Sequence, residues 1–139
     1  MYIALEGIDT AGKSTQISKL AEHFPDAIIT KEPGGTEIGK EIREIVLNAK
    51  IQSKKAEFLL FLADRAEHIK EVIEPNLEKM IISDRSAVSG VAYALIQGEI
   101  SETAIIHLNR FATNGIYPKK VFLLQLTKEE LELRLSQKK

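Results

Sequence analysis

The segment from residue 7 to residue 14 constrains the fold more than any other part of the chain. It reads Gly-Ile-Asp-Thr-Ala-Gly-Lys-Ser and matches the pattern G-x-x-x-x-G-K-[ST]. A short apolar run precedes it, and a stretch with helical periodicity follows it. A phosphate chain needs donors at close range, which a glycine-rich backbone, a lysine and a helix N-terminus supply. The segment therefore predicts a P-loop that joins a strand to a helix and binds phosphates.

The residues of this loop have different expected roles. Lys13 adds a positive charge, and its side chain is expected to be exposed at the loop. The hydroxyl of Ser14 is expected to hold magnesium. Backbone N–H groups are expected to wrap the phosphates along the whole loop, which consists of Gly7, Ile8, Asp9, Thr10, Ala11, Gly12, Lys13 and Ser14.

Composition limits the kind of protein this can be. With 139 residues, of which 44% are hydrophobic, the chain suits a single domain, residues 1–139, with a substantial core. A net charge of −1 argues against a general attraction to nucleic acid or to an acidic membrane. The absence of cysteine excludes disulfides and thiolate metal sites. No apolar run approaches transmembrane length and no signal peptide precedes the first strand, so we expect a cytoplasmic protein.

Four short apolar runs predict the sheet. They are rich in Ile, Leu and Val and lie at residues 2–5, 27–29, 80–82 and 121–126, separated by segments with helical periodicity. Such runs are typical of parallel strands that helices cover on both faces. We therefore predict an α/β fold with three layers, α/β/α, whose ligand site lies at the carboxyl ends of the strands.

Capping residues and apolar periodicity predict the helices. One helix follows the P-loop, and another begins after Thr36. Later helices are expected to stop at Gly98 and at Asn114, with Ser101 as an N-cap between them. The residues expected to face the core are Ile17, Leu20, Ala21, Phe24, Ile38, Ile42, Ile45, Val46, Phe58, Leu62, Ile69, Ile73, Val88, Val91, Ala92, Leu95, Ala104, Leu108 and Phe111.

Two further patterns point to functional residues. The third apolar run ends in Asp84-Arg85, and a carboxylate at the end of a buried strand is typical of the acidic residue that serves magnesium in P-loop enzymes. Phe61 and Arg65 lie four residues apart on one face of a long helix, which Pro75 is expected to kink or end. Core packing of Phe61 is the alternative interpretation. Three histidines lack the spacing of metal ligands and receive no role: His23, His68 and His107.

Taken together, these motifs closely resemble those of the bacterial thymidylate kinase family. The P-loop alone marks only a superfamily, whereas the whole set, in this order and spacing, is specific. The resemblance runs from Met1 to about Leu135 and implies a P-loop NTPase fold. Besides the P-loop it rests on Glu32-Pro33-Gly34-Gly35, Leu59-Leu60-Phe61-Leu62-Ala63-Asp64-Arg65, Asp84-Arg85 with Ser89 and Ala92-Tyr93, and Phe111-Ala112-x-Asn114-Gly115-x-Tyr117-Pro118.

The resemblance implies a kinase that transfers the γ-phosphoryl group of ATP to dTMP, giving dTDP and ADP for dTTP biosynthesis. Such a transfer requires positioning and charge neutralisation more than covalent chemistry. By resemblance, Lys13 spans the transferring phosphates, and Ser14 and Asp84 serve Mg²⁺. The resemblance also implies that Arg85 would hold the acceptor phosphate. Members of the family resemble one another in forming homodimers, so we expect a homodimer.

The resemblance also implies a monophosphate pocket. Phe61 would stack on the thymine, and Arg65 would donate to a carbonyl of the base. Asp9 would accept from the 3′-hydroxyl of the sugar, and Tyr93 would lie near C2′ and disfavour ribose. The full set of expected substrate-binding residues is Asp9, Glu32, Pro33, Arg43, Phe61, Arg65, Arg85, Ser89 and Tyr93.

The chain departs from the family pattern at its carboxyl end and inside the P-loop. Thr10 occupies a position where some members carry a catalytic arginine, so the chain resembles the class that supplies this arginine from a lid. The last helix begins at Lys128, with Thr127 and Glu130 as its capping box, and is expected to run to Lys139. The lid and the last strand would follow it, so we expect both to be absent from these 139 residues.

Two substitutions leave alternative functions open. Ser86 follows Asp84-Arg85 where the family usually has an aromatic residue or histidine, and this favours a deoxynucleoside kinase as the alternative. The Glu32-Pro33-Gly34-Gly35 segment argues against it. Ala94 replaces a polar amide of many members, so thymine selectivity would depend more on Arg65. A catalytically silent nucleotide-binding module is the third possibility, against which the intact Lys13 and Asp84-Arg85 argue.

Overall fold

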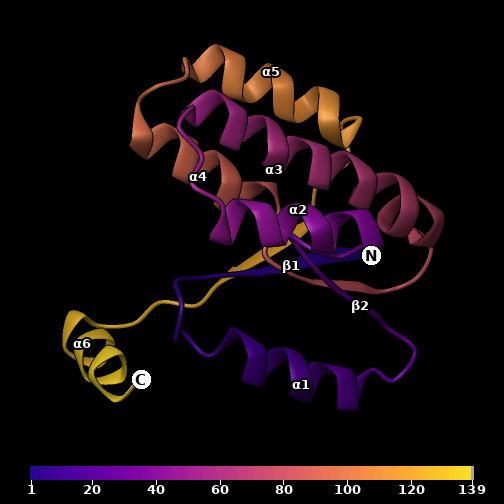
Figure 1. Ribbon diagram of the computed structural model, residues 1–139. Coiled ribbons are helices and arrows are strands. Elements are labelled where there is room, and N and C mark those ends of the chain that lie inside the picture. Colours follow the sequence, from indigo (N-terminus) through magenta and orange to yellow (C-terminus); the bar gives the residue numbers. More distant parts are fainter. Residues whose placement is uncertain (139) are drawn as a thin grey trace.

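A parallel sheet of four strands lies at the centre of the fold (Figure 1). The computed structural model describes residues 1–138. The strands are β1 Tyr2–Glu6, β2 Ile28–Lys31, β3 Ile81–Asp84 and β4 Lys120–Leu123. They lie in the order β2-β3-β1-β4, and every neighbouring pair is parallel. The predicted sheet is confirmed, with strand ends shifted by a few residues.

Helices cover the sheet on both faces, as predicted. Figure 1 shows α1 on one face, α2 to α5 on the other, and α6 apart from these layers. The bounds are α1 Lys13–His23, α2 Glu37–Asn48, α3 Lys54–His68, α4 Ala87–Gln97, α5 Glu102–Thr113 and α6 Lys128–Gln137. A π-helical turn, Ile69–Ile73, and a 3-10 turn, Glu74–Asn76, extend α3, and the helical segment ends one residue after Pro75, close to the predicted position. The three-layer α/β/α arrangement is therefore confirmed.

The predicted caps place the helix ends correctly. The hydroxyl of Thr36 accepts from the backbone N–H of Gly39, and Ser101 accepts in the same way from Ala104. Asn114 ends α5 in the left-handed conformation, at φ 54°. Gly98 ends α4 in that conformation too. The last residue of the predicted final helix, Lys139, lies outside the described residues.

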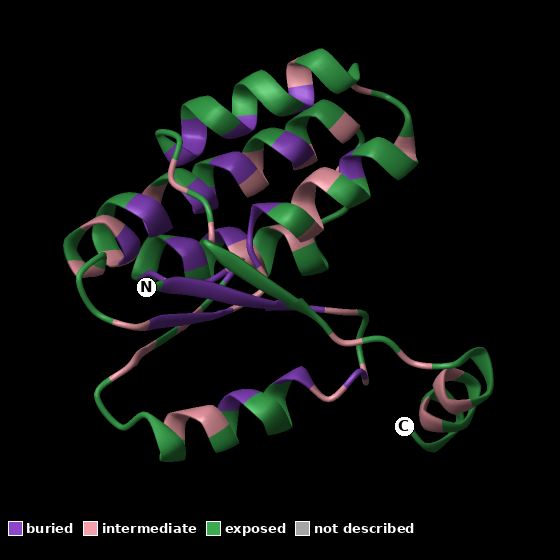
Figure 2. Ribbon diagram, turned by 180° about the vertical axis from the view of Figure 1, so that it is seen from behind, coloured by how far each residue is buried: buried purple, intermediate pink, exposed green. Residues whose placement is uncertain are grey.

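Three apolar clusters hold the layers together (Figure 2). Ile17 of α1 packs under the sheet against β1 and β3. On the other face, Ile69 and Ile73 pack against Tyr2 and Ile81. A third cluster joins α3, α4 and α5 through Phe58, Leu62, Ala94, Ile105 and Ala112. These clusters fix α1 and α3 against the sheet, and α1 carries Lys13 and Ser14 of the site described below.

The predicted core faces of α2, α4 and α5 are partly wrong. These helices carry apolar residues on more than one face, so periodicity alone does not select the buried one. In α5 the buried residues are Ile105, Asn109, Ala112 and Thr113. The strand β4 is exposed along its length, because it lies at the sheet edge and pairs only with β1. Exposed residues that were expected in the core are Phe24, Ile38, Ile45, Val88, Ala92, Leu95, Leu108 and Phe111.

The length and the apolar content of a helix decide whether it could cross a membrane. Among residues 1–138, no helix is both long enough and apolar enough to cross a bilayer.

Candidate active site at the carboxyl ends of the strands

The carboxyl ends of β1, β2 and β3 open into one cavity of about 570 Å³. Three segments far apart in the sequence meet there, namely the P-loop, the turn after β2 and the turn after β3. Its lining residues are Asp9, Thr10, Gly12, Lys13, Ser14, Thr15, Lys31, Glu32, Arg43, Asp84, Arg85 and Arg134. The position agrees with the prediction that the ligand site lies at this edge of the sheet.

The P-loop folds tightly between β1 and α1. Gly7 lies so close to the chain after β4 that a Cβ there would stand 2.9 Å from the carbonyl oxygen of Leu124. Lys13 is the first residue of α1, and its Nζ donates to the carbonyl oxygens of Gly7, at 3.1 Å, and Ile8, at 3.3 Å. The lysine side chain therefore folds back across the loop. The expected exposure of Lys13 is wrong, because this contact leaves it only 7% exposed.

Positive charge gathers around the cavity. Burial lowers the pKa of Lys13, and the nearby Arg85 guanidinium lowers it further, while Asp84 and Asp9 act in the opposite direction. Arg134, on α6, lines the same cavity and donates through Nη1 to the carbonyl oxygen of Thr10 at 2.7 Å. A site built from clustered cations in a concave surface attracts a polyanion. Sequence reasoning had not singled out Arg134.

Asp84 suits a hard cation. One of its carboxylate oxygens, Oδ1, is buried and has no hydrogen-bond partner among residues 1–138. A buried carboxylate oxygen without a partner is costly unless a ligand completes it. Ser14 lines the same cavity. The described residues contain no group of three or more His, Cys, Asp or Glu side chains that could hold a metal alone. Asp84 and Ser14 thus fit Mg²⁺, which binds proteins through few side chains together with phosphate and water oxygens.

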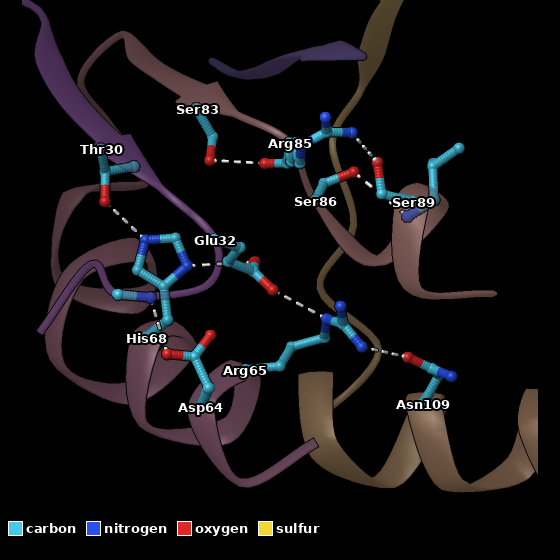
Figure 3. Close-up of polar contacts among 12 residues, drawn as sticks. Thr30, Glu32, Asp64, Arg65, His68, Ser83, Arg85, Ser86, Ser89 and Asn109 are labelled. Carbon is cyan, nitrogen blue, oxygen red and sulfur yellow. Dashed lines mark hydrogen bonds and ion pairs between the residues drawn. The ribbon is translucent and has the colours of Figure 1, made fainter. Parts of the chain in front are cut away.

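Arg85 is anchored from several directions (Figure 3). Its backbone has φ 69°, and its N–H donates to the carbonyl oxygen of Leu5 at 2.9 Å. In the side chain, Nη1 donates to Ser89 Oγ at 3.1 Å and Nη2 lies 3.4 Å from Asp9 Oδ1. The expected residues Asp9, Arg85 and Ser89 therefore lie together.

A buried carboxylate that the sequence analysis missed supports this arginine. Glu6 accepts from Ser86 Oγ at 2.7 Å and also contacts the hydroxyl of Ser89. Ser86 is 1% exposed, so its hydroxyl and the carboxylate of Glu6 form a buried pair behind Arg85.

The turn after β2 is held by α2 and α3. Asp64 Oδ1 accepts from the backbone N–H of Gly34 at 2.9 Å. Arg43 Nη1 donates to the carbonyl oxygen of Pro33 at 2.9 Å. Gly34 has φ 96°, a conformation that favours glycine, and a Cβ there would stand 2.9 Å from Arg43 Cδ and displace that side chain. These contacts place Glu32 and Arg43 in the cavity lining.

Glu32 is fully enclosed by partners. Its carboxylate accepts from Arg65 Nε at 2.8 Å and contacts His68 Nδ1 at 3.0 Å. Burial opposes ionisation of Glu32, but the hydrogen bond from His68 and the charge of Arg65 outweigh it and hold the pKa of this carboxyl below its usual range. The side chain is therefore an ionised carboxylate at neutral pH.

The cavity does not bring all expected substrate residues together. Phe61 is half-buried on α3, and Tyr93 is 50% exposed on α4; neither lines the cavity. Arg65 is 3% exposed and reaches the lining only through Glu32. The phosphate half of the expected site is thus assembled, while the base half lies beside it between α3 and α4.

A pH-dependent stability is expected from Asp64. Burial raises its pKa to about 6, above the value of 3.8 for a free side chain, although the N–H of Gly34 partly opposes the shift. Between these two pH values the folded protein keeps a proton that the unfolded chain releases, so the contribution of Asp64 to stability is present near pH 4 and is lost as pH rises through 6. Asp64→Asn cannot ionise and keeps an oxygen for Gly34. We therefore expect the stability difference, the free energy of unfolding of Asp64→Asn minus that of wild type, to increase with pH. The increase from pH 4 to pH 7.5 should be on the order of 2 kcal/mol.

Urea denaturation at the two pH values measures this change. Asp26→Asn, at an exposed aspartate, is the matched control and should show no such trend. A stability difference between Asp64→Asn and wild type that stays constant with pH would contradict the assignment.

The P-loop before α1, the acidic end of the neighbouring strand β3 and the arginines across the cavity define a P-loop phosphotransferase. The thymidylate kinase family model matches residues 5–139, and this chain belongs to that family. A thymidylate kinase of Sulfurimonas denitrificans is 88% identical over 139 residues, which make up 100% of this chain and 73% of that protein. One of Wolinella succinogenes is 56% identical over 138 residues, 99% of this chain and 71% of that protein.

A solved structure agrees with this membership. The crystal structure of thymidylate kinase from Ehrlichia chaffeensis matches this fold with a TM-score of 0.83 and 32% sequence identity, and the match covers 99% of this chain and 78% of that one. The predicted α/β fold of P-loop type is therefore confirmed, and so is the resemblance from which the function was expected.

Proposed function

We propose that the cavity at the carboxyl ends of β1, β2 and β3 carries out the reaction of the family, the phosphorylation of dTMP to dTDP, with ATP as the phosphate donor. An oxygen of the dTMP phosphate attacks the γ-phosphorus of ATP, and the bond between that phosphorus and the bridging oxygen breaks to release ADP. The observation that carries this proposal is the meeting of Lys13 with Asp84 and Arg85 in one cavity.

The donor side is formed by the P-loop. Backbone N–H groups of residues 7–14 and the N-terminus of α1 surround the phosphates of ATP. Lys13, which lies across the loop, turns from the carbonyl oxygens of Gly7 and Ile8 toward the transferring phosphate. Ser14 and Asp84 would hold Mg²⁺, which neutralises charge on the phosphates when bound. No side chain is needed as a nucleophile.

The acceptor side is formed by the turns after β2 and β3. Arg85 binds the phosphate of dTMP through its guanidinium, and Asp9, which pairs with Arg85 at 3.4 Å, accepts from the sugar. Glu32 and Arg43 line the same side of the cavity, and Arg43 donates to the carbonyl oxygen of Pro33. Ser89 orients Arg85, and Tyr93 borders the sugar. Phe61 and Arg65 contact the thymine from α3.

An assay of ADP release tests the proposed function. The purified enzyme is given ATP, Mg²⁺ and a panel of nucleoside monophosphates and nucleosides. We expect dTMP to be the preferred acceptor. A preference for thymidine would instead favour a deoxynucleoside kinase, and nucleotide binding without ADP release would favour a silent binding module.

Phe61→Ala is expected to weaken dTMP binding by roughly 1 to 3 kcal/mol, on the scale of base–aromatic stacking. Affinity for ATP should not change, because Phe61 lies on α3, away from the P-loop. Isothermal titration with each nucleotide, beside thermal unfolding, measures both effects. Leu59→Ala, at an exposed residue of the same helix, is the control. A large loss of thermal stability with unchanged dTMP affinity would show that Phe61 is a core residue.

The homodimer and the cytoplasmic location belong to the same proposal. Family membership supports the homodimer, and a reaction that consumes ATP and a nucleotide supports the cytoplasmic location. Exposed apolar residues on α2, such as Ile38, Ile45 and Leu47, offer a surface for a second copy.

We also propose that the chain forms one domain, residues 1–139.

A further inference from the structure

Five polar side chains form one connected set of hydrogen bonds behind the cavity (Figure 3). They come from β2, the turn after it, α3 and α5, and are Thr30, Glu32, Arg65, His68 and Asn109. Four of them are almost completely buried, at 4% exposure for Glu32, 3% for Arg65, 0% for His68 and 1% for Asn109. So much buried polarity is costly unless it is fully paired, which suggests a role beyond stability. The proposed function uses only Glu32 and Arg65.

The guanidinium of Arg65 is held on three sides. Its Nε donates to Glu32 Oε1 at 2.8 Å, and its Nη1 donates to Asn109 Oδ1 at 2.7 Å. On the third side, a Cβ added to Gly90 of α4 would stand 2.7 Å from Nη2. Within residues 1–138, Nη2 itself makes no hydrogen bond. Arg65 therefore cannot rotate without breaking a buried bond, and it keeps one donor group free beside α4.

Asn109 is oriented so that it can only accept from Arg65. Its Nδ2 donates to the carbonyl oxygen of Ile105, one turn earlier in α5, at 2.8 Å. This bond fixes which end of the amide faces Arg65, and the oxygen is left for Nη1. Asn109 thus links the position of Arg65 to α5.

His68 holds Glu32 in a similar way. The carboxylate of Glu32 can only accept, so Nδ1 of His68 carries the proton of their 3.0 Å contact. The other ring nitrogen, Nε2, lies 2.6 Å from Thr30 Oγ1. The ring is therefore fixed between β2 and the turn after it, and it sets the carboxylate against which Arg65 rests.

The charges decide what kind of group Arg65 can recognise. Glu32 is a carboxylate, so its charge cancels that of Arg65. A compensated guanidinium suits a neutral acceptor, such as a pyrimidine carbonyl, better than a second phosphate. Thymine presents a carbonyl oxygen at C4, where cytosine presents an amino group. A fixed N–H donor can donate to the carbonyl oxygen of thymine. The same donor is left unpaired beside the amino group of cytosine.

We propose that Asn109 and His68 are positioning residues for the selection of thymine over cytosine, with Asn109 holding Arg65 directly and His68 holding it through Glu32. This inference rests on the proposed function, in which Arg65 contacts the base. Neither residue touches the substrate. Their effect therefore belongs in the ratio of kcat/KM for dTMP to kcat/KM for dCMP, which does not depend on how much of a preparation is folded.

Two substitutions of His68 separate its two contacts. The amide nitrogen of asparagine takes the place of Nδ1, so His68→Asn keeps the donor to Glu32 and loses Thr30. In His68→Gln the amide nitrogen takes the place of Nε2, so the contact with Glu32 is lost. We expect His68→Gln to lower the dTMP-to-dCMP ratio about tenfold or more, as for a lost buried bond to a charged group, and His68→Asn to stay near wild type.

Asn109→Leu tests the direct contact. It removes the acceptor at similar volume, and we expect a fall of about tenfold in the same ratio, with the KM for ATP unchanged. Thr113→Val is the matched control, because Thr113 lies one turn later on the buried face of α5 and does not contact Arg65. If Asn109→Leu does not fold, the His68 pair carries the same test.

The outcomes distinguish the inference from the proposed function. Lower ratios in His68→Gln and Asn109→Leu, with normal ratios in His68→Asn and Thr113→Val, would support the inference. A wild-type enzyme that prefers dTMP, with all four variants keeping its ratio, would overturn the inference alone. A wild-type enzyme that does not phosphorylate dTMP would overturn both.

Discussion

Lys13→Met is expected to lower kcat by about 10²-fold or more, the scale found when a charge-stabilising donor is removed from a transition state. Methionine keeps the length of the stem but cannot donate to the transferring phosphate. The fold should be retained, because within residues 1–138 the hydrogen bonds of Lys13 Nζ go only to the carbonyl oxygens of Gly7 and Ile8. Burial already lowers the pKa of Lys13, so the loss of its charge should not destabilise the protein.

Steady-state kinetics with dTMP and ATP measures this effect. Lys19→Met is the matched control, since Lys19 lies on the exposed face of the same helix and should behave like wild type. A Lys13→Met enzyme with near-normal turnover would mean that the P-loop is not the catalytic site.

Arg85→Ala is expected to lower kcat/KM for dTMP by about 10²-fold, chiefly through a higher KM, because charge-assisted bonds to the acceptor phosphate are lost. The KM for ATP should change little. Arg85 extends toward Asp9 and Ser89, on the acceptor side of the cavity. Arg110→Ala, at an exposed arginine of α5, is the control.

Arg85→Lys refines this test. Lysine keeps the charge but not the forked geometry of the guanidinium. The kcat/KM of Arg85→Lys for dTMP should therefore lie between the values of wild type and Arg85→Ala. A rise in the KM for ATP with an unchanged KM for dTMP would place Arg85 on the donor side and contradict the assignment.

Local patterns predicted most of the fold. The P-loop, the helix caps at Thr36 and Ser101 and the stop at Asn114 depend on short-range chemistry, which a sequence displays directly. Burial was harder to predict. In α5 the apolar residues Leu108 and Phe111 are exposed, while the polar Asn109 is buried, because Arg65 of α3 needs an acceptor there. Only the packed neighbours decide such a choice.

The phosphate half of the site could be predicted from the sequence, and the supporting contacts could not. Lys13 and Asp84-Arg85 stand out because they occupy fixed places relative to strand ends. Glu6 and His68 do not stand out, because their partners are distant in the sequence. Glu6 pairs with Ser86, and His68 pairs with Glu32. One signal was present for His68, which lies three residues after Arg65 and so shares its helix face.

The transfer of a labelled phosphate shows whether the enzyme phosphorylates dTMP and whether Lys13 is needed for it. Wild-type enzyme and Lys13→Met are each incubated with dTMP, Mg²⁺ and ATP labelled at the γ-phosphate, and the products are separated. We expect labelled dTDP, one equivalent for each ADP formed, from the wild type and about 10²-fold less from Lys13→Met. Labelled inorganic phosphate without labelled dTDP, or equal labelling of dTDP by both enzymes, would contradict this expectation.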